Sequence, residues 1–205
     1  MAEHNTLTDP AIHEPKGAST AALGEVYVSN GAGGGTWTPL AIGTTVGFVD
    51  FNDAATAGTP IVVTGGAGYV YLTNDTLGIF TNTAYLPTGV TTAVWDTALN
   101  KFDWAAGGLE LGDMIDIRLD ITVTTTGANQ SLDVALEMDT DGFAFDIPFD
   151  RGLVKTAGTL TVDRYNGIYM GNTGALTGKA RFKIQSDGNA TVVVNGWYCK
   201  FLINR

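Results

Sequence analysis

The chain has 205 residues, of which 44% are hydrophobic and 16% are charged, and its formal net charge is −10. This balance predicts a folded core and is unlike the low hydrophobicity and high charge of disordered chains. Lys16 is the only basic residue before Lys101. This excludes nucleic acid and an anionic membrane surface as main partners, because both bind clustered Lys and Arg.

Residues 1–38 are rich in glycine and punctuated by proline, and they predict an extended arm that cannot form a core by itself. The run Val26, Tyr27 and Val28 is its one strand nucleus. Both histidines, His4 and His13, lie in this arm. The periodicity of the sequence identifies no ordered partner residue for either histidine, so a catalytic base or a zinc site is not predicted.

Residues 39–107 predict a β-rich connecting region. Short β-favouring runs separated by Gly, Asp and Asn predict strands at about 46–51, 60–64 and 68–73. A longer excursion follows, in which Trp95, Phe102 and Trp104 are expected to pack as one apolar patch.

Residues 108–205 predict a β-sandwich or jelly roll, because short strands alternate with frequent turn signals and helical periodicity is weak. The run "MIDIRLDITVTT" alternates apolar and polar residues throughout, which predicts a half-buried strand. After the turn "TGANQ" the same phase continues, which predicts a hairpin partner for that strand. The apolar residues of this expected partner strand are Leu132, Val134, Leu136 and Met138.

The last third of the chain predicts a second hairpin and a bulge. "RFKIQ" and "ATVVV" flank "SDGN", in which Asp187 and Gly188 suit a tight turn with positive φ angles. The apolar phase then shifts at Gly196, as it does at a β-bulge. Three basic residues at alternate positions predict one solvated strand face: Lys179, Arg181 and Lys183.

No catalytic constellation emerges, and an enzyme, a cofactor and a metal site are not predicted. "DTDG" lacks the ligand and glycine positions of a helix-flanked calcium loop. Asp139, Asp141 and Asp146 are interpreted as solvated turn acids, with an irregular cation site as the alternative. Cys199 is the only cysteine of the sequence, so an intrachain disulfide is excluded. It is predicted to be a buried structural thiol in a protein assembled in a reducing compartment. The first ten residues lack the basic start and apolar run of a signal peptide.

Exposed aromatic residues near the C-terminus leave two interpretations open. Tyr165, Tyr169, Trp197 and Tyr198 suit stacking on sugars, whereas "RYNGIYMG" also suits the polar-rimmed edge of a subunit interface. The interface is favoured, and its predicted residues are Tyr165, Ile168, Tyr169, Trp197 and Phe201.

Two stretches resemble structural proteins of tailed bacteriophages. "DPAIHEPKGASTAALGEVYVSNGAGGGTW" is similar to an N-terminal segment of head fibres, decoration proteins and some tail fibres. "IPFDRGLVKTAGTLTVDRYNGIYMG" and "FKIQSDGNATVVVNGWYCKFLI" resemble the C-terminal β-domain of phage fibre or capsid-decoration proteins. The resemblance implies a trimeric jelly roll similar in outline to tumour-necrosis-factor-like domains, attached to the particle through Ile12, His13, Glu14, Pro15, Lys16 and Gly17.

The resemblance therefore implies a head decoration, cement or head-fibre protein on the outer surface of the phage head, assembled in the host cytoplasm. Its expected partners are the major capsid protein and further copies of itself. The apolar arm residues Val26, Tyr27, Val28 and Trp37 are expected to be buried against the capsid. The alternative is a module of a tail or head fibre that binds host glycans, and a polysaccharide-degrading enzyme ranks last.

Overall fold

A computed structural model describes residues 21–23, 25–29, 35–39, 44–54, 58–73, 77–139 and 144–204. The chain divides into two units. The first contains residues 1–43 with Arg205, and the second is the compact unit of residues 44–204. The attachment residues predicted at 12–17 lie outside the described ranges.

The described part of the first unit contains a two-stranded antiparallel sheet of β1 (Glu25–Ser29) and β2 (Gly35–Pro39). Tyr27 lies directly opposite Trp37, and their rings meet edge to face with centroids 5.4 Å apart. A Cβ on Gly35 would come within 2.8 Å of the Tyr27 ring, so glycine makes room for this aromatic pair. The strand predicted around residues 26–28 is present, and it pairs within its own unit.

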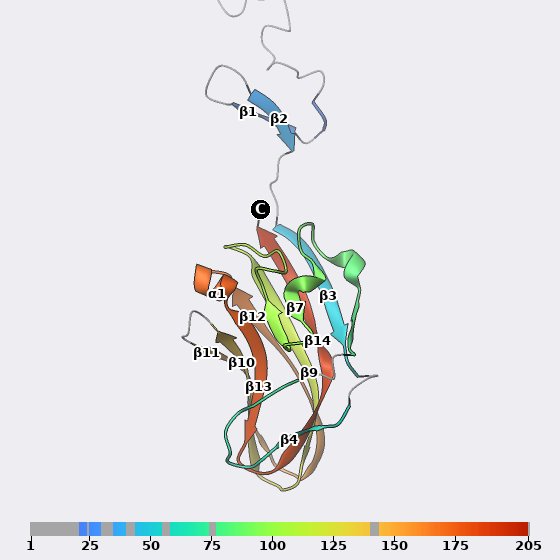
Figure 1. Cartoon of the computed structure of the whole chain (residues 1–205), viewed down its shortest axis with the longest axis vertical. Coiled ribbons are helices and arrows are strands. Elements are labelled where there is room, and N and C mark those ends of the chain that lie inside the picture. Colours follow the sequence, from blue (N-terminus) through green and yellow to red (C-terminus); the bar gives the residue numbers. More distant parts are fainter. Residues whose placement is uncertain are drawn as a thin grey trace, which may run out of the picture. The chain divides into compact units, whose positions relative to one another are not determined.

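The second unit is built from two antiparallel sheets that pack face to face (Figure 1). One sheet has the strand order β12-β9-β14-β3-β6, with β4 also paired to β14. These strands are β3 (Thr44–Asn52), β4 (Ile61–Val63), β6 (Ile79–Thr81), β9 (Met114–Thr125), β12 (Gly158–Tyr169) and β14 (Ala190–Asn204).

The other sheet has the order β11-β10-β13-β8-β7, with β5 also paired to β13. Its strands are β5 (Val70–Tyr71), β7 (Trp95–Asp96), β8 (Lys101–Asp103), β10 (Gln130–Asp139), β11 (Phe145–Val154) and β13 (Lys179–Ser186). Within the described residues, three short helices lie in the connections: η4 (Thr83–Tyr85), η5 (Thr92–Val94) and α1 (Thr173–Thr177).

The strand order is that of a jelly roll. Counting β3, β5 and β9 to β14 as successive strands one to eight, the sheets have the orders one-eight-three-six and two-seven-four-five. Successive strands therefore alternate between the two sheets, except for β10 and β11, which pair within one sheet. The prediction of an all-β sandwich or jelly roll is confirmed.

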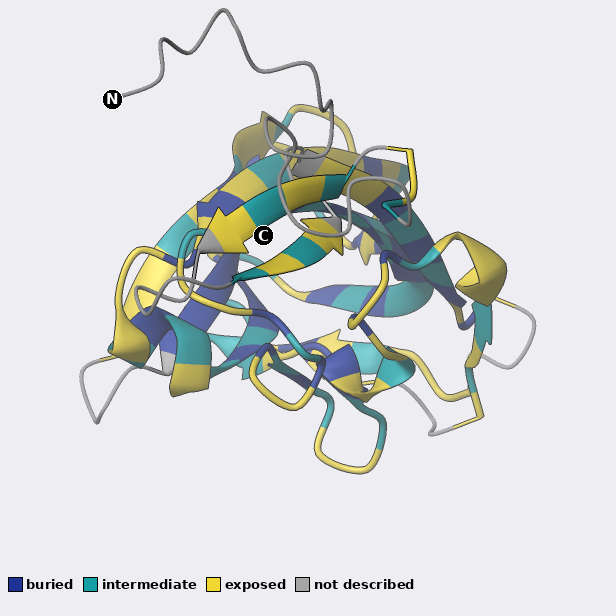
Figure 2. Cartoon of the chain, turned by 90° about the horizontal axis from the view of Figure 1, so that it is seen from above, coloured by how far each residue is buried: buried dark blue, intermediate teal, exposed yellow. Residues whose placement is uncertain are grey.

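Alternation along the strands creates the core, and Figure 2 shows buried positions alternating with exposed or half-buried ones. The inward residues of β9 are all at most 1% exposed: Ile115, Ile117, Leu119, Ile121 and Val123. Phe102 stacks on Trp104 at 4.7 Å between ring centroids and meets Trp95 edge to face at 4.6 Å. The predicted aromatic patch is therefore present, and Trp197 extends it at 5.0 Å from Phe102.

Both predicted hairpins are wrong. Strands β9 and β10 lie in different sheets, as do β13 and β14. The two connections are arches across one end of the sandwich, and Gly188 does not have a positive φ. Side chains join these arches: Asp187 Oδ1 accepts from the Ser131 amide at 2.8 Å, and Gln130 Nε2 donates to the Asn189 carbonyl at 3.1 Å.

The predicted bulge is confirmed. The register of β14 against β9 shifts between Val194 and Gly196, and Gly196 has a φ of 146°. A Cβ at Gly196 would lie 2.2 Å from the Phe51 carbonyl oxygen, so this position favours glycine. Strands β3 to β8 contribute to both sheets. The region predicted as a connection at 39–107 therefore shares one sandwich with 108–204 from residue 44 onward.

Candidate functional site

A cluster of charged side chains covers the outer face of β10 and β13. Alternation directs Lys179, Arg181 and Lys183 outward as predicted, but these residues are not freely solvated. In the register Arg181 lies opposite Glu137, and Lys179 pairs with Asp103 at 3.0 Å. The predicted solvated face is therefore a network of ion pairs.

Lys183 is the most enclosed member of the network, with 10% of its side chain exposed. Its Nζ lies 2.8 Å from both Glu137 Oε2 and Asp146 Oδ1, and 4.4 Å from the centroid of the Tyr69 ring. Arg181 Nη2 donates to Glu137 Oε1 at 3.1 Å. The two cations thus hold one buried carboxylate from both sides.

Two tyrosines also contact this network, from a segment that is distant in sequence from β10 and β13. Tyr69 and Tyr71 alternate along the β5 segment and reach over β13 toward the acids of β10. The Tyr71 ring lies 3.3 Å from the Arg181 guanidinium carbon, measured to the ring centroid, and its hydroxyl donates to Glu137 at 3.2 Å. Cations enclosed between aromatic faces and carboxylates are held in fixed positions.

The network shifts the pKa values of its buried charges. Burial opposes ionisation of Glu137, but hydrogen bonds from Lys183, Arg181 and Tyr71 outweigh it and lower the pKa of that carboxyl. Burial likewise disfavours the charged form of Lys183, yet Asp146 and Glu137 raise its pKa above the ordinary value. Both groups are charged at neutral pH, which suits a structural ion pair better than proton transfer.

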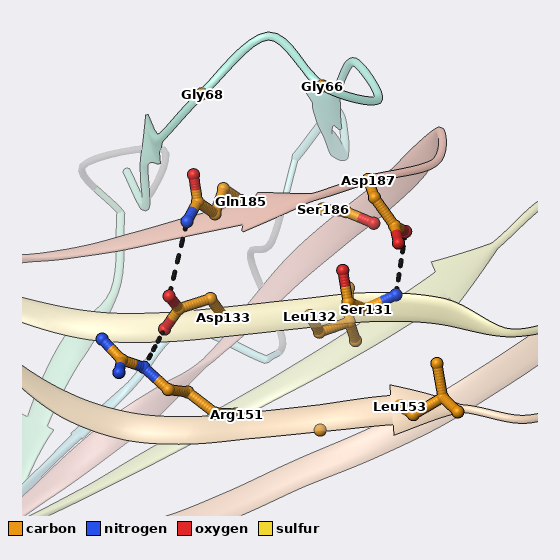
Figure 3. A pocket seen from close by; sticks show the side chains of 11 residues that line it. Gly66, Gly68, Ser131, Leu132, Asp133, Arg151, Leu153, Gln185, Ser186 and Asp187 are labelled. Atoms are coloured by element: carbon orange, nitrogen blue, oxygen red, sulfur yellow. Dashed lines mark hydrogen bonds and ion pairs between the residues drawn. The ribbon is translucent and has the colours of Figure 1, made fainter.

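A pocket of about 660 Å³ lies beside this network, at the arched end of the sandwich (Figure 3). At its centre Asp133 accepts hydrogen bonds from Tyr69 Oη at 2.7 Å, Arg151 Nε at 3.1 Å and Gln185 Nε2 at 3.4 Å. Gly66 and Gly68 lie on the loop above the pocket. Leu153, which is 57% exposed, forms an apolar part of its wall.

The two carboxylates that line this pocket are both hydrogen-bonded within the protein. Three donors fix the orientation of the Asp133 carboxylate, and the second carboxylate of the lining, Asp187, accepts from the Ser131 amide at 2.8 Å. Asp133, Glu137, Tyr69 and Tyr71 are not among the site residues predicted from the sequence. A signal was available, since "GYVYL" and "LDVALEMD" place these polar side chains at alternate positions on their strands.

The alternative of an irregular cation site rests partly on residues whose side chains lie outside the described parts, Asp139 and Asp141. Asp146 is ion-paired with Lys183. Within the described ranges, no group of three or more His, Cys, Asp and Glu side chains is arranged to hold a metal ion.

The predicted interface residues fall into two classes. Ile168 and Trp197 are 4% exposed and Phe201 is fully buried, so all three belong to the core of the single chain and offer no interface surface. Tyr165 and Tyr169 are each 59% exposed. Side chains alternate between the two faces of β12, so Tyr165 and Tyr169 lie on its outer face whereas Ile168 points inward. Cys199 is buried as predicted, and burial raises the pKa of its thiol.

The described attachment residues lie in the β1–β2 hairpin. Val26 and Val28 point to one face and are 36% and 51% exposed. Tyr27 and Trp37 lie on the other face, where they contact each other. In the parts of the chain that the structure describes, no helix is long and apolar enough to cross a membrane.

Comparisons with known proteins give distant structural likenesses only. No family model and no curated protein matches the chain. The VP2 subviral particle of infectious bursal disease virus is 9% identical over 86% of this chain, with a TM-score of 0.43. This chain spans 36% of that capsid chain.

Two further solved structures are similar at lower scores. The CBM22-1 xylan-binding domain of Paenibacillus barcinonensis Xyn10C is 12% identical over 74% of this chain and all of that domain, with a TM-score of 0.35. The cowpea mosaic virus top component is 10% identical over 78% of this chain and 82% of its own, with a TM-score of 0.29. The assignment of a jelly roll rests on the sheet order described above.

Proposed function

We propose that this chain is a structural protein of a virus particle, a phage head decoration or cement protein that binds the major capsid protein through its N-terminal unit. The observation that carries this proposal is the division into two units, one whose described part contains the β1–β2 hairpin and the other a sandwich with its own core. The N-terminal phage-like segment ends within the first unit. The jelly roll is then displayed on the outer surface of a head assembled in the host cytoplasm.

The physics of the hairpin supports an attachment role. An isolated two-stranded sheet is marginally stable, and its edges carry backbone groups that another strand can pair with. Val26 and Val28 add exposed apolar side chains on one face. Docking on a coat subunit buries these side chains and pairs an open edge, so the hairpin gains stability when it binds.

Self-association into a trimer is the second part of the proposal. Four apolar side chains are aligned across the outer face of the β12-β9-β14-β3 sheet by its register: Tyr169, Met114, Leu202 and Val46. Tyr169, Met114 and Val46 are 59%, 42% and 57% exposed. We call these four residues the apolar row. An aligned apolar band of this kind suits contact with another subunit.

Attachment is tested with the double substitution Val26→Asp and Val28→Asp in the full chain. Binding is measured by co-sedimentation with empty heads that lack this protein. We expect the double variant to lose binding at least about tenfold, because two buried charges oppose docking. The matched control is Val62→Asp in β4, a valine that is 67% exposed on the sandwich. Unchanged binding of the double variant would refute attachment through the hairpin.

A further inference from the structure

A second pocket lies on the outer face of the β12-β9-β14-β3 sheet, at the β-bulge. It has a volume of about 310 Å³, and we call it the bulge pocket. Gly196 lies opposite Asp120 on one side and Asn52 on the other, so the centre of the pocket has no side chain above the sheet. The bulge thus opens a hollow on a strand that is otherwise continuous.

Polar side chains from three strands converge on the bulge pocket. Asn195, the extra residue of the bulge, donates from Nδ2 to Asp120 Oδ1 at 2.9 Å and to Thr122 Oγ1 at 3.0 Å. Across the pocket, Asp50 accepts from Asn82 Nδ2. An ionised carboxylate has about four acceptor positions, so each Asp retains acceptor capacity for the hydroxyl groups of a ligand.

Arg118 provides the donors. Its guanidinium carbon lies 5.8 Å from the centroid of the Tyr165 ring and 5.6 Å from that of Tyr198. Its Nε lies 3.7 Å from Asp163 Oδ1, which is longer than a hydrogen bond. The register places Tyr165, Arg118, Tyr198 and Asp50 in one line across four strands. Two aromatic rings therefore hold an arginine fork at the margin of the pocket.

We infer that the bulge pocket binds a neutral saccharide. A sugar presents adjacent hydroxyl groups, which suit paired carboxylate and amide acceptors beside an arginine fork, and an apolar ring face, which suits the 59% exposed Tyr165. The pocket carries two carboxylates and one guanidinium, and the chain has a net charge of −10. The excess of negative charge in the pocket and the negative net charge of the chain both disfavour an anionic sugar.

The bulge pocket is separate from the proposed subunit contact. Met114 of the apolar row and Asp120 of the pocket lie on the same outward face of β9, six positions apart. The nearest pocket residue on β9 is Arg118, four positions from Met114 and about 13 Å away along the strand, so the pocket and the apolar row share no residue.

The test is a titration of the full chain with the methyl glycosides of glucose, galactose, mannose and N-acetylglucosamine, with sialyllactose as the anionic probe. Binding is followed by nitrogen–proton NMR at the Arg118 Nε–H, the Asn195 side-chain amide and the Gly196 amide. We expect at least one neutral glycoside to shift all three signals with a dissociation constant of about 1 mM. Sialyllactose is expected to bind more weakly.

Two pocket variants and one control complete the design. Arg118→Met and Asp50→Asn should each weaken binding at least about tenfold, because each removes a charged hydrogen-bonding group. Asp116→Asn is the control, since Asp116 lies two positions from Arg118 on the same face of β9 but does not line the pocket. It should leave the affinity within about twofold.

The inference is overturned if no neutral glycoside shifts these signals at about 50 mM, a concentration well above the expected constant. It is equally overturned if sialyllactose binds more tightly, or if every folded pocket variant binds as well as the control. Either pocket variant alone decides the matter when the other fails to fold. The titration contains no capsids, so its result is independent of the attachment role proposed for the hairpin.

Discussion

The Lys183 network allows a quantitative test of how the outer face of β13 is stabilised. Lys183→Met keeps most of the apolar stem of the side chain and removes its charge. Glu137, whose side chain is 11% exposed, then loses one of its two cations and keeps Arg181. Removing one member of a buried ion pair costs about 3–5 kcal/mol. Because Arg181 and Tyr71 remain, we expect a loss of about 2 kcal/mol at pH 7.

The assay is thermal and denaturant unfolding of the full chain, in which the sandwich transition is followed. For a unit of this size, a loss of about 2 kcal/mol lowers Tm by about 4–8 °C. The matched control is Lys200→Met on the other sheet, whose ion pair with Asp116 is 3.8 Å long with both side chains about 40% exposed. An exposed pair of this kind contributes at most about 1 kcal/mol, so the control should be nearly neutral.

The pH dependence gives a second check. The folded-state pKa of Glu137 lies below the ordinary value of 4.5, so its stabilisation is present above that pH and is lost as pH falls through the folded pKa. The Lys183 pKa is raised, so its contribution is lost only as pH rises above its ordinary value of 10.5. The difference in unfolding free energy between wild type and Lys183→Met should therefore be constant from about pH 6 to 9 and shrink in acid.

Two results would refute this reasoning. One is a loss for Lys183→Met no larger than that for Lys200→Met, which would mean that the network is as weak as an exposed pair. The other is a difference that grows on acidification, because a protonated Glu137 no longer needs a cation. The second result would place the effect in packing or in another titrating group.

Three further predictions concern the bulge, the thiol and the apolar row. Gly196→Ala should destabilise the sandwich by about 3 kcal/mol in denaturant titrations, since a Cβ there meets the Phe51 carbonyl oxygen and φ is 146°; near-wild-type stability would contradict this. Cys199 should react with a thiol reagent only at the rate of unfolding, because it is fully buried with a raised pKa; fast labelling of the native protein would show otherwise. Met114→Asp should convert a micromolar trimer into monomers in sedimentation equilibrium, and the trimer proposal fails if the wild type is monomeric or the variant stays trimeric.

The sequence alone determined which residues of the strongest strands face the core. Alternation is a property of the extended backbone, so the inward residues of β9 and the strand nucleus at Val26 could be recognised without knowing their neighbours. The phase shift at Gly196 identified the bulge for the same reason, since an inserted residue reverses the facing of all the residues that follow.

Tertiary structure decided which strands are neighbours. An alternating pattern gives the same burial whether the next strand pairs beside it or lies in the facing sheet, and so it cannot distinguish the arches at "TGANQ" and "SDGN" from hairpin turns. Likewise the pattern placed Lys183 on an outer face but did not show that Tyr69 covers it and that Glu137 and Asp146 bind it. These contacts join residues dozens of positions apart, and only the folding of distant strands onto one sheet brings them together.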